Sequence, residues 1–125
     1  MKTIITAQNA PAALGPYSHA VACGNMLFTS GQIGLDPATG KLAGESIEAQ
    51  AEQVLKNLES VLAAAGMDFS HVIKTTVFLV DLADFATVNG IYGTRFASDC
   101  PARSCVQVAA LPAGAKIEIE VIAAK

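Results

Sequence analysis

The sequence predicts a single α+β domain in which one β-sheet carries two helices on one of its faces. Three observations favour this class. An amphipathic helical repeat covers residues 47–65, a β-branched run covers residues 72–80, and apolar and charged residues alternate over residues 116–123. The chain has 125 residues, the usual length of one domain, so we assign residues 1–125 to one unit.

The first predicted element is a hairpin. Its strands are residues 17–23 and 26–30, and Gly24 with Asn25 forms the two-residue turn that tight antiparallel pairing favours.

The helix over residues 47–65 is the clearest element. Its apolar residues fall on one stripe, Ser46 is a suitable N-cap, and Gly66 is a suitable residue to follow its C-terminus. The run VIKTTVFLV at residues 72–80 contains neither glycine nor proline, which is typical of a buried strand.

The second half of the chain predicts a second helix and two final strands. Asp81 caps a helix that runs to about Ser98, with an inner stripe of Phe85, Val88, Tyr92 and Phe96. The strands are residues 103–110 and 116–123, and the segment LPAGA joins them. The order is two strands and a helix, a strand and a helix, then two strands.

Composition narrows the classes of function. Charged residues make up 15% and apolar residues 52%, so we expect apolar surface to meet further copies of the chain. The net charge is −3 and the only arginines are Arg95 and Arg103, a balance that argues against nucleic-acid binding. Three widely spaced cysteines favour free thiols in a reducing compartment, and no signal peptide or membrane span is apparent. We therefore expect a cytoplasmic protein without a metal site.

The last two strands hold the candidate site. Alternation places Arg103, Cys105 and Gln107 on one face of their strand, and Glu118 with Glu120 on one face of theirs. If LPAGA forms a hairpin, the polar faces coincide on a surface that points away from the helices. A guanidinium matches a carboxylate ligand bidentately, and a glutamate beside it can activate water. A structural Arg–Glu pair across two strands explains the same pattern.

Other candidates are weaker. Cys105 is a candidate nucleophile or a small pocket-lining residue, and Tyr17 fits either the core or a site wall. Ser30 and Gly31 end a strand at a point where a ligand can approach the backbone. His19 and His71 favour surface or hydrogen-bonded positions over catalysis.

Five segments together resemble the reactive intermediate deaminase family, the RidA or YjgF-type proteins, and its RidA subfamily in particular. They are NAPAALGPYSHAV, FTSGQIGLDPATG, QAEQVLKNLESVLAAAG, VIKTTVFLVDLADFATVNGIY and PARSCVQVAALPAGAKIEIEVIA. The resemblance implies a chorismate-mutase-like fold with one mixed β-sheet, assembled as a homotrimer with sites between subunits.

The resemblance also implies an activity: hydrolysis of small 2-imino or 2-enamino acids, the products of pyridoxal-phosphate enzymes, to 2-keto acids and ammonia, without a cofactor. By position, Arg103 resembles the carboxylate-binding residue and Glu118 the residue that positions water. Tyr17, Ser30, Gly31 and Cys105 resemble substrate-binding, pocket-lining positions. A related aminoacrylate deaminase of pyrimidine catabolism, a non-catalytic ligand-binding or chaperone-like trimer, and an RNA-cleaving protein are the alternatives.

Overall fold

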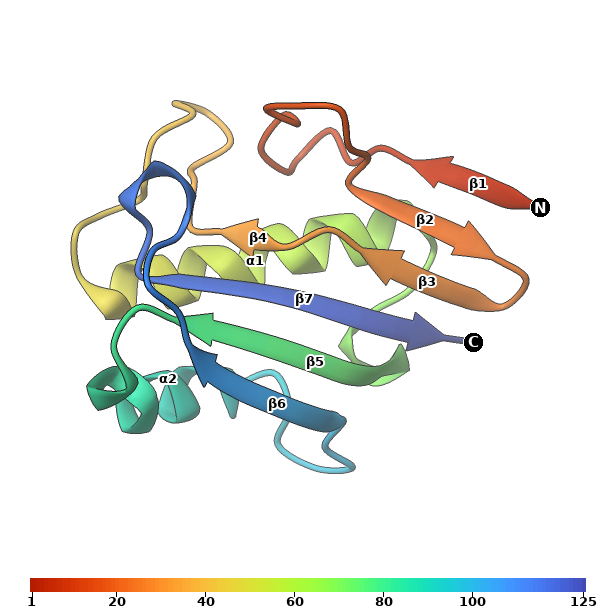
Figure 1. The fold of residues 1–125 in the computed structure, drawn as a ribbon. Helices are drawn as coiled ribbons and strands as arrows, with labels where there is room; N and C mark the ends of the chain where they lie inside the picture. Colours follow the sequence, from red (N-terminus) through yellow and green to blue (C-terminus); the bar gives the residue numbers. More distant parts are fainter.

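A seven-stranded mixed sheet forms the centre of the computed structural model, which describes residues 1–125 (Figure 1). The strand order is β1-β2-β3-β7-β5-β6, with β4 paired to β7 beyond the end of β3. Only β5 and β6 run parallel. The strands are β1 Lys2–Ile5, β2 Ala20–Cys23, β3 Met26–Thr29, β4 Gln32–Ile33, β5 Val72–Leu79, β6 Ala102–Gln107 and β7 Ile117–Ala124. The predicted α+β class and mixed sheet are confirmed.

The predicted hairpin is confirmed as β2 and β3. Cys23 pairs with Met26, and Gly24 between them has φ +60°, a conformation that costs glycine little. Strand β1, which pairs with β2, was not predicted. Its four residues KTII are too few to show a period of two.

Helix α1, Ile47–Ala64, confirms the first predicted helix. The Ser46 hydroxyl accepts a hydrogen bond from the Ala49 N–H at 3.1 Å, and Gly66 has φ +72° after the C-cap. Its inner stripe is buried against the sheet and consists of Ile47, Ala51, Val54, Leu55, Leu58, Val61 and Leu62.

The second helix is shorter than predicted. Asp81 caps a 3₁₀ turn, η2 Leu82–Asp84, and α2 covers only Phe85–Tyr92. Gly93 follows its last residue, and glycine is a poor helix former. Phe96 still joins the core beyond the helix, because its ring packs on Tyr92 with centroids 4.6 Å apart.

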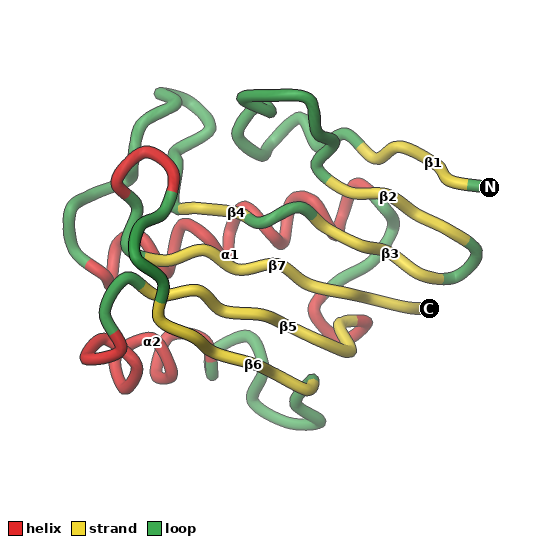
Figure 2. The backbone as a smooth tube through the Cα atoms, viewed as in Figure 1, coloured by secondary structure: helices red, strands yellow, loops and turns green.

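The predicted hairpin of the last two strands is wrong. Strand β5 lies between β6 and β7, pairing in parallel with β6 and antiparallel with β7. Helix α2 is the crossover that returns the chain to β6 beside β5. The LPAGA segment, which contains the 3₁₀ turn η3 Pro112–Gly114, therefore connects two strands that are not neighbours (Figure 2).

The two faces of the sheet differ. Both helices lie on one face, where Val54 of α1 and Val88 of α2 share a core with Val77 of β5. The other face carries no helix, and Phe28 and Val106 on it remain 45% and 44% exposed. None of the helices combines the length and apolar character that crossing a bilayer requires.

Candidate active site

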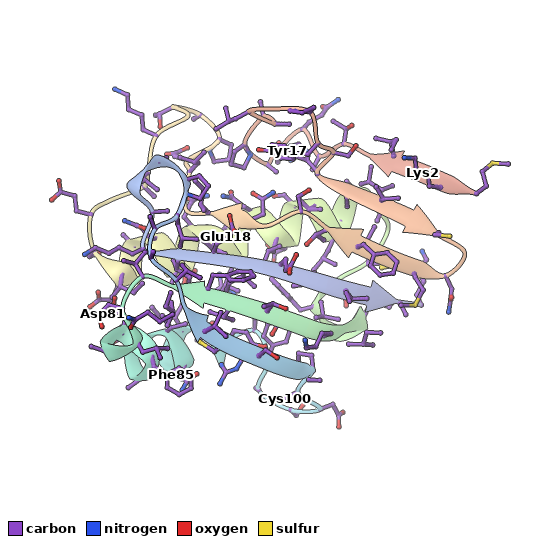
Figure 3. All side chains as sticks on the ribbon, in the orientation of Figure 1. Lys2, Tyr17, Asp81, Phe85, Cys100 and Glu118 are labelled. Carbon is purple, nitrogen blue, oxygen red and sulfur yellow. The ribbon has the colours of Figure 1, made fainter.

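Arg103 lies on the helix face of β6. It pairs with the buried Thr75 of β5. Its guanidinium carbon lies 4.9 Å from the ring centre of Tyr92 and 5.3 Å from that of Phe85, which is labelled in Figure 3. Arg103 Nη1 donates to Asn89 Oδ1 at 2.7 Å. The expectation that Arg103 and Cys105 face away from the helices is therefore wrong. Strand β5 lies beside β6, and the residues of β5 that pair with Arg103 and Cys105 are Thr75 and Val77, both of which face the core under the helices.

The guanidinium of Arg103 lacks a carboxylate partner within the chain. The other arginine, Arg95, donates through Nη1 and Nη2 to both carboxylate oxygens of Glu52 on α1. The alternative of a structural Arg–Glu pair across two strands is therefore not found at Arg103, and the Arg–Glu pair of this chain instead joins Arg95 to helix α1. Only one donor of the Arg103 guanidinium is used inside the chain, so the rest of its fork is free to take an anionic ligand.

Helix α2 orients this arginine through three residues spaced along one of its faces, Phe85, Asn89 and Tyr92. The Tyr92 hydroxyl is 2.8 Å from the Thr75 hydroxyl, which fixes the ring, and burial raises the pKa of Tyr92. Phe85 and Tyr92 were predicted as core residues of this helix, and no role was predicted for Asn89. Their spacing of four and three residues places them on one face of a helix, and this spacing could have identified them as a group in the sequence.

Cys105 is half-buried beside the core, two residues along β6 from Arg103. Burial raises the pKa of its thiol, and the positive charge of Arg103 only partly offsets that effect. A raised pKa disfavours the thiolate, which is the nucleophilic form. The structure therefore favours the pocket-lining interpretation of Cys105 over the nucleophile.

Glu118 lies on the opposite face of the sheet from Arg103. On β7 it pairs with Phe78 and with Ile33. It lines a cavity of about 180 Å³ together with Tyr17, Gly31 and other residues, and Figure 3 labels Glu118 and Tyr17. Burial, and then the nearby charge of Glu120, raise the pKa of Glu118. The cavity is lined by Pro11, Ala12, Leu14, Tyr17, His19, Gly31, Gln32, Ile33, Leu35, Pro112 and Glu118.

The predicted substrate-binding residues thus divide between two places. Tyr17 and Gly31 lie in the cavity with Glu118, and the Tyr17 hydroxyl accepts a hydrogen bond from the Leu14 N–H at 3.1 Å. Ser30 supports the cavity from beside it, because its hydroxyl donates to the Ser18 carbonyl at 2.6 Å. Cys105 lies with Arg103 on the other face.

Gly31 packs directly against the Glu118 carboxyl group, with no room between them for a side chain. A Cβ at this position would lie 2.7 Å from Glu118 Cδ and 2.9 Å from Oε1, nearer than nonbonded atoms approach. We expect Gly31→Ala to push the carboxyl group aside. With the water-positioning role that the family resemblance implies for Glu118, this should lower kcat/KM by about 10- to 100-fold, because small misplacements of catalytic groups are costly. Steady-state kinetics and thermal unfolding would measure this.

Gly90 provides the matched control. It is exposed in α2 and a Cβ there would meet nothing within 4 Å. We expect Gly90→Ala to stabilise the fold by about 0.5–1 kcal/mol with unchanged kinetics. Unchanged kinetics in Gly31→Ala would show that Glu118 need not stay where the structure places it.

Arg103 and Glu118 of one chain are too far apart to hold the same small substrate. Two strand spacings and about three residues along the strands separate them, which puts their Cα atoms about 14 Å apart. Their side chains also point to opposite faces of the sheet. One copy therefore presents two half-sites: a cation on its helix face and a carboxyl group in a cavity on the other.

The chain belongs to the family whose model is described as Endoribonuclease L-PSP, which matches residues 7–125. The predicted resemblance to the RidA or YjgF-type proteins is thereby confirmed. A relative from Arabidopsis thaliana, Reactive Intermediate Deaminase A, chloroplastic, is 57% identical over 122 residues. The match covers 98% of this chain and 65% of the plant protein, so the chain spans just under two thirds of that relative.

Other relatives match over nearly their full length. The 2-iminobutanoate/2-iminopropanoate deaminase of Mus musculus is 51% identical, with 98% of this chain and 91% of that protein covered. Among solved structures, E. coli TdcF with bound serine has a TM-score of 0.94 and 46% identity, with 98% of each chain covered. RidA from an Antarctic Psychrobacter has a TM-score of 0.95 and 46% identity, covering 98% of this chain and 99% of that one.

Proposed function

We propose that this protein hydrolyses small 2-imino acids, such as 2-iminobutanoate and 2-iminopropanoate, to 2-keto acids and ammonia. The observation that carries the proposal is the Arg103 guanidinium, held by Asn89 and two aromatic rings and free of any internal carboxylate. Such a fork binds the carboxylate of an imino acid in two parallel hydrogen bonds. The relatives named as deaminases of these two substrates support the choice of ligand.

Glu118 supplies the second half of the proposed chemistry. Its carboxylate takes a proton from water as the water oxygen bonds to C2 and the C2=N double bond opens, and it passes that proton to the nitrogen, which gives a carbinolamine. The carboxylate then takes the proton of the new hydroxyl group and returns it to the amine nitrogen. The C2–N bond breaks, ammonia leaves, and C2 becomes the carbonyl carbon of the keto acid. A raised pKa brings this carboxyl group closer to the working pH, which suits a group that accepts and returns a proton.

The site is completed by a second subunit in this proposal. Arg103 and Glu118 lie on opposite faces of one sheet, and the helix-free face exposes the apolar side chains of Phe28 and Val106. Packing that face against another copy buries these side chains and brings the two half-sites together. By family resemblance we propose a homotrimer with three such sites.

Subunit mixing tests the shared site. Arg103→Met and Glu118→Gln proteins, each expected to be at least about 100-fold less active alone, are unfolded and refolded together. Random assembly restores an intact site where the arginine of one subunit meets the glutamate of another, which gives about a quarter of the wild-type activity. No recovery, while light scattering still shows an oligomer, would mean that each site lies within one subunit.

Three alternatives have distinct outcomes. An aminoacrylate deaminase uses similar chemistry and differs in its preferred imine. A ligand-binding or chaperone-like trimer shows binding without turnover. An RNA-cleaving protein is suggested by the description of the family model, but the net charge of −3 favours a small substrate over a polyanion.

The deciding experiment couples the protein to a threonine or serine dehydratase, which releases the corresponding imine. We expect keto-acid release to accelerate when the protein is added, and a panel of imines to rank its preferences. A lack of acceleration with every small imine would favour the binding protein, and cleavage of a labelled RNA would favour the nuclease. We further propose a cytoplasmic location, supported by the three free cysteines.

A further inference from the structure

His19 is a buried titratable side chain that the proposed reaction does not use, with 6% of its surface exposed. The Ala7 N–H donates to its Nδ1 at 2.9 Å, and its Nε2 lies 2.7 Å from the Pro11 carbonyl oxygen. A backbone N–H can only donate and a carbonyl can only accept. The ring is therefore the neutral tautomer with its proton on Nε2.

The imidazole holds a loop that lacks regular structure, residues 6–18 between β1 and β2. Its two hydrogen bonds are the side-chain bonds that attach the first half of this loop to the sheet. The main chain of His19 is itself fixed, because its carbonyl accepts the Ser30 N–H at 2.9 Å. The ring thus connects the irregular segment 6–18 to the beginning of β2, where the main chain is hydrogen-bonded to the sheet.

The loop forms one wall of the cavity that contains Glu118. Pro11, Ala12, Leu14 and Tyr17 of the loop line it, and His19 lines it beside them. Releasing the loop would open this wall and move Tyr17 out of the cavity that it lines with Glu118.

We propose that His19 is a positioning residue and that its neutral imidazole is a pH-sensitive latch on this loop. Protonation places a proton on Nδ1, so two donors would meet across the 2.9 Å contact with Ala7, and a cation would be buried. The latch opens in acid and closes near neutral pH. The link to catalysis rests on the proposed function, because it requires the cavity to hold the substrate.

Two titratable groups share the cavity with His19: Tyr17 and Glu118. A second hollow bordered by His19 is lined, apart from His19 and Tyr17, by residues without titratable side chains. No lysine or arginine lines either one. Glu118 is thus the one carboxyl group that shares this cavity with His19, and Glu118→Gln tests how much it contributes to the pH dependence.

Glutamine separates hydrogen bonding from titration. In His19→Gln, the amide oxygen can accept from Ala7 and the amide nitrogen can donate to Pro11, but the side chain does not change charge. His19→Ala removes both hydrogen bonds. The readout is backbone hydrogen exchange of residues 6–18 at about pH 7.5 and pH 5, corrected for intrinsic rates, since these values bracket the usual titration of histidine.

In the wild type we expect loop protection to fall at least about fivefold at the lower pH, whereas His19→Gln keeps similar protection at both values. His19→Ala is expected to be unprotected at both. A wild-type loop that stays protected in acid, or a glutamine variant that loses protection equally, would overturn the latch. If the alanine variant does not fold, the wild-type and glutamine proteins decide the matter.

Kinetics then link the latch to turnover. We expect the acid loss of kcat/KM, measured relative to each protein's own value near neutral pH, to be smaller in His19→Gln than in the wild type. An identical acid loss beside a pH-dependent loop would refute positioning but not the latch. A protein that hydrolyses no imine while its loop still opens in acid would refute the proposed function and leave the latch standing.

Discussion

Arg103→Met is expected to lower kcat/KM by at least about 1,000-fold, because the substrate carboxylate loses a bidentate charged partner. Methionine keeps an unbranched apolar stem beside Tyr92 and Phe85, so the rings stay covered. Arg103→Lys keeps a point charge but lacks the planar fork, and we expect an intermediate loss. Steady-state kinetics on enzymatically generated imines measure both variants.

Arg95→Met is the matched control, since it removes the other arginine. Its hydrogen bonds with Glu52 hold the segment after α2 to α1, and they lower the pKa of that carboxyl group. We expect a loss of about 1 kcal/mol in unfolding free energy, with unchanged kcat/KM. A lowered pKa means that this stability is present above the unfolded pKa and fades as pH falls through the folded one.

The pair of variants separates substrate binding from folding. Arg103→Met should change the unfolding free energy by about 1 kcal/mol or less, the value of its ring contacts. Near-normal activity in Arg103→Met would end the proposal that this arginine holds the substrate. Equal losses of activity in both variants would point instead to a general weakening of α2.

Glu118→Gln is the second large effect, with an expected drop in kcat of about 100- to 10,000-fold, the range for a lost general base. The unfolding free energy of this variant should not fall with its activity. Because burial raises the pKa of Glu118 in the folded protein, a charged carboxylate at this position lowers the unfolding free energy at pH values above the pKa of the unfolded chain. A neutral amide of the same shape removes this cost, so the melting temperature near neutral pH should be unchanged or higher.

Glu120→Gln is the control for Glu118. It lies two residues further along β7, on the same face, and its charge contributes to the raised pKa of Glu118. Removing that charge should shift the acid limb of kcat/KM to lower pH without lowering the plateau. The comparison is made in the His19→Gln background, where the imidazole cannot titrate. An unmoved acid limb would mean that Glu118 is not the group that titrates in it.

Local pattern was sufficient for much of the fold. The α1 stripe with its Ser46 cap, the Gly24 turn and the buried run in β5 follow from periods of 3.6 and 2 and from turn chemistry. These features depend on neighbours within a few residues. The pattern predicted α2 too long and missed β1, because two glycines in the α2 segment and a strand of only four residues leave little periodicity to follow.

Strand order was decided by tertiary structure. Alternation correctly grouped Arg103 with Cys105, and Glu118 with Glu120, but it could not say which group faces the helices. That depended on β5 entering between β6 and β7, a pairing between residues far apart in sequence. The same insertion placed Arg103 over Tyr92 and Glu118 in the cavity with Tyr17.

The sequence by itself determined the class of fold and the family, and it was enough to propose the residues that carry the chemistry, because these are matters of local pattern and of residue type. Only the tertiary structure decided that the two arginines differ, one paired with Glu52 and the other free. It alone placed Arg103 and Glu118 on opposite faces of the sheet. It alone also showed that the His19 ring is hydrogen-bonded to the loop that lines the cavity. The physical reason is that charge pairing and burial depend on contacts that form when distant segments meet.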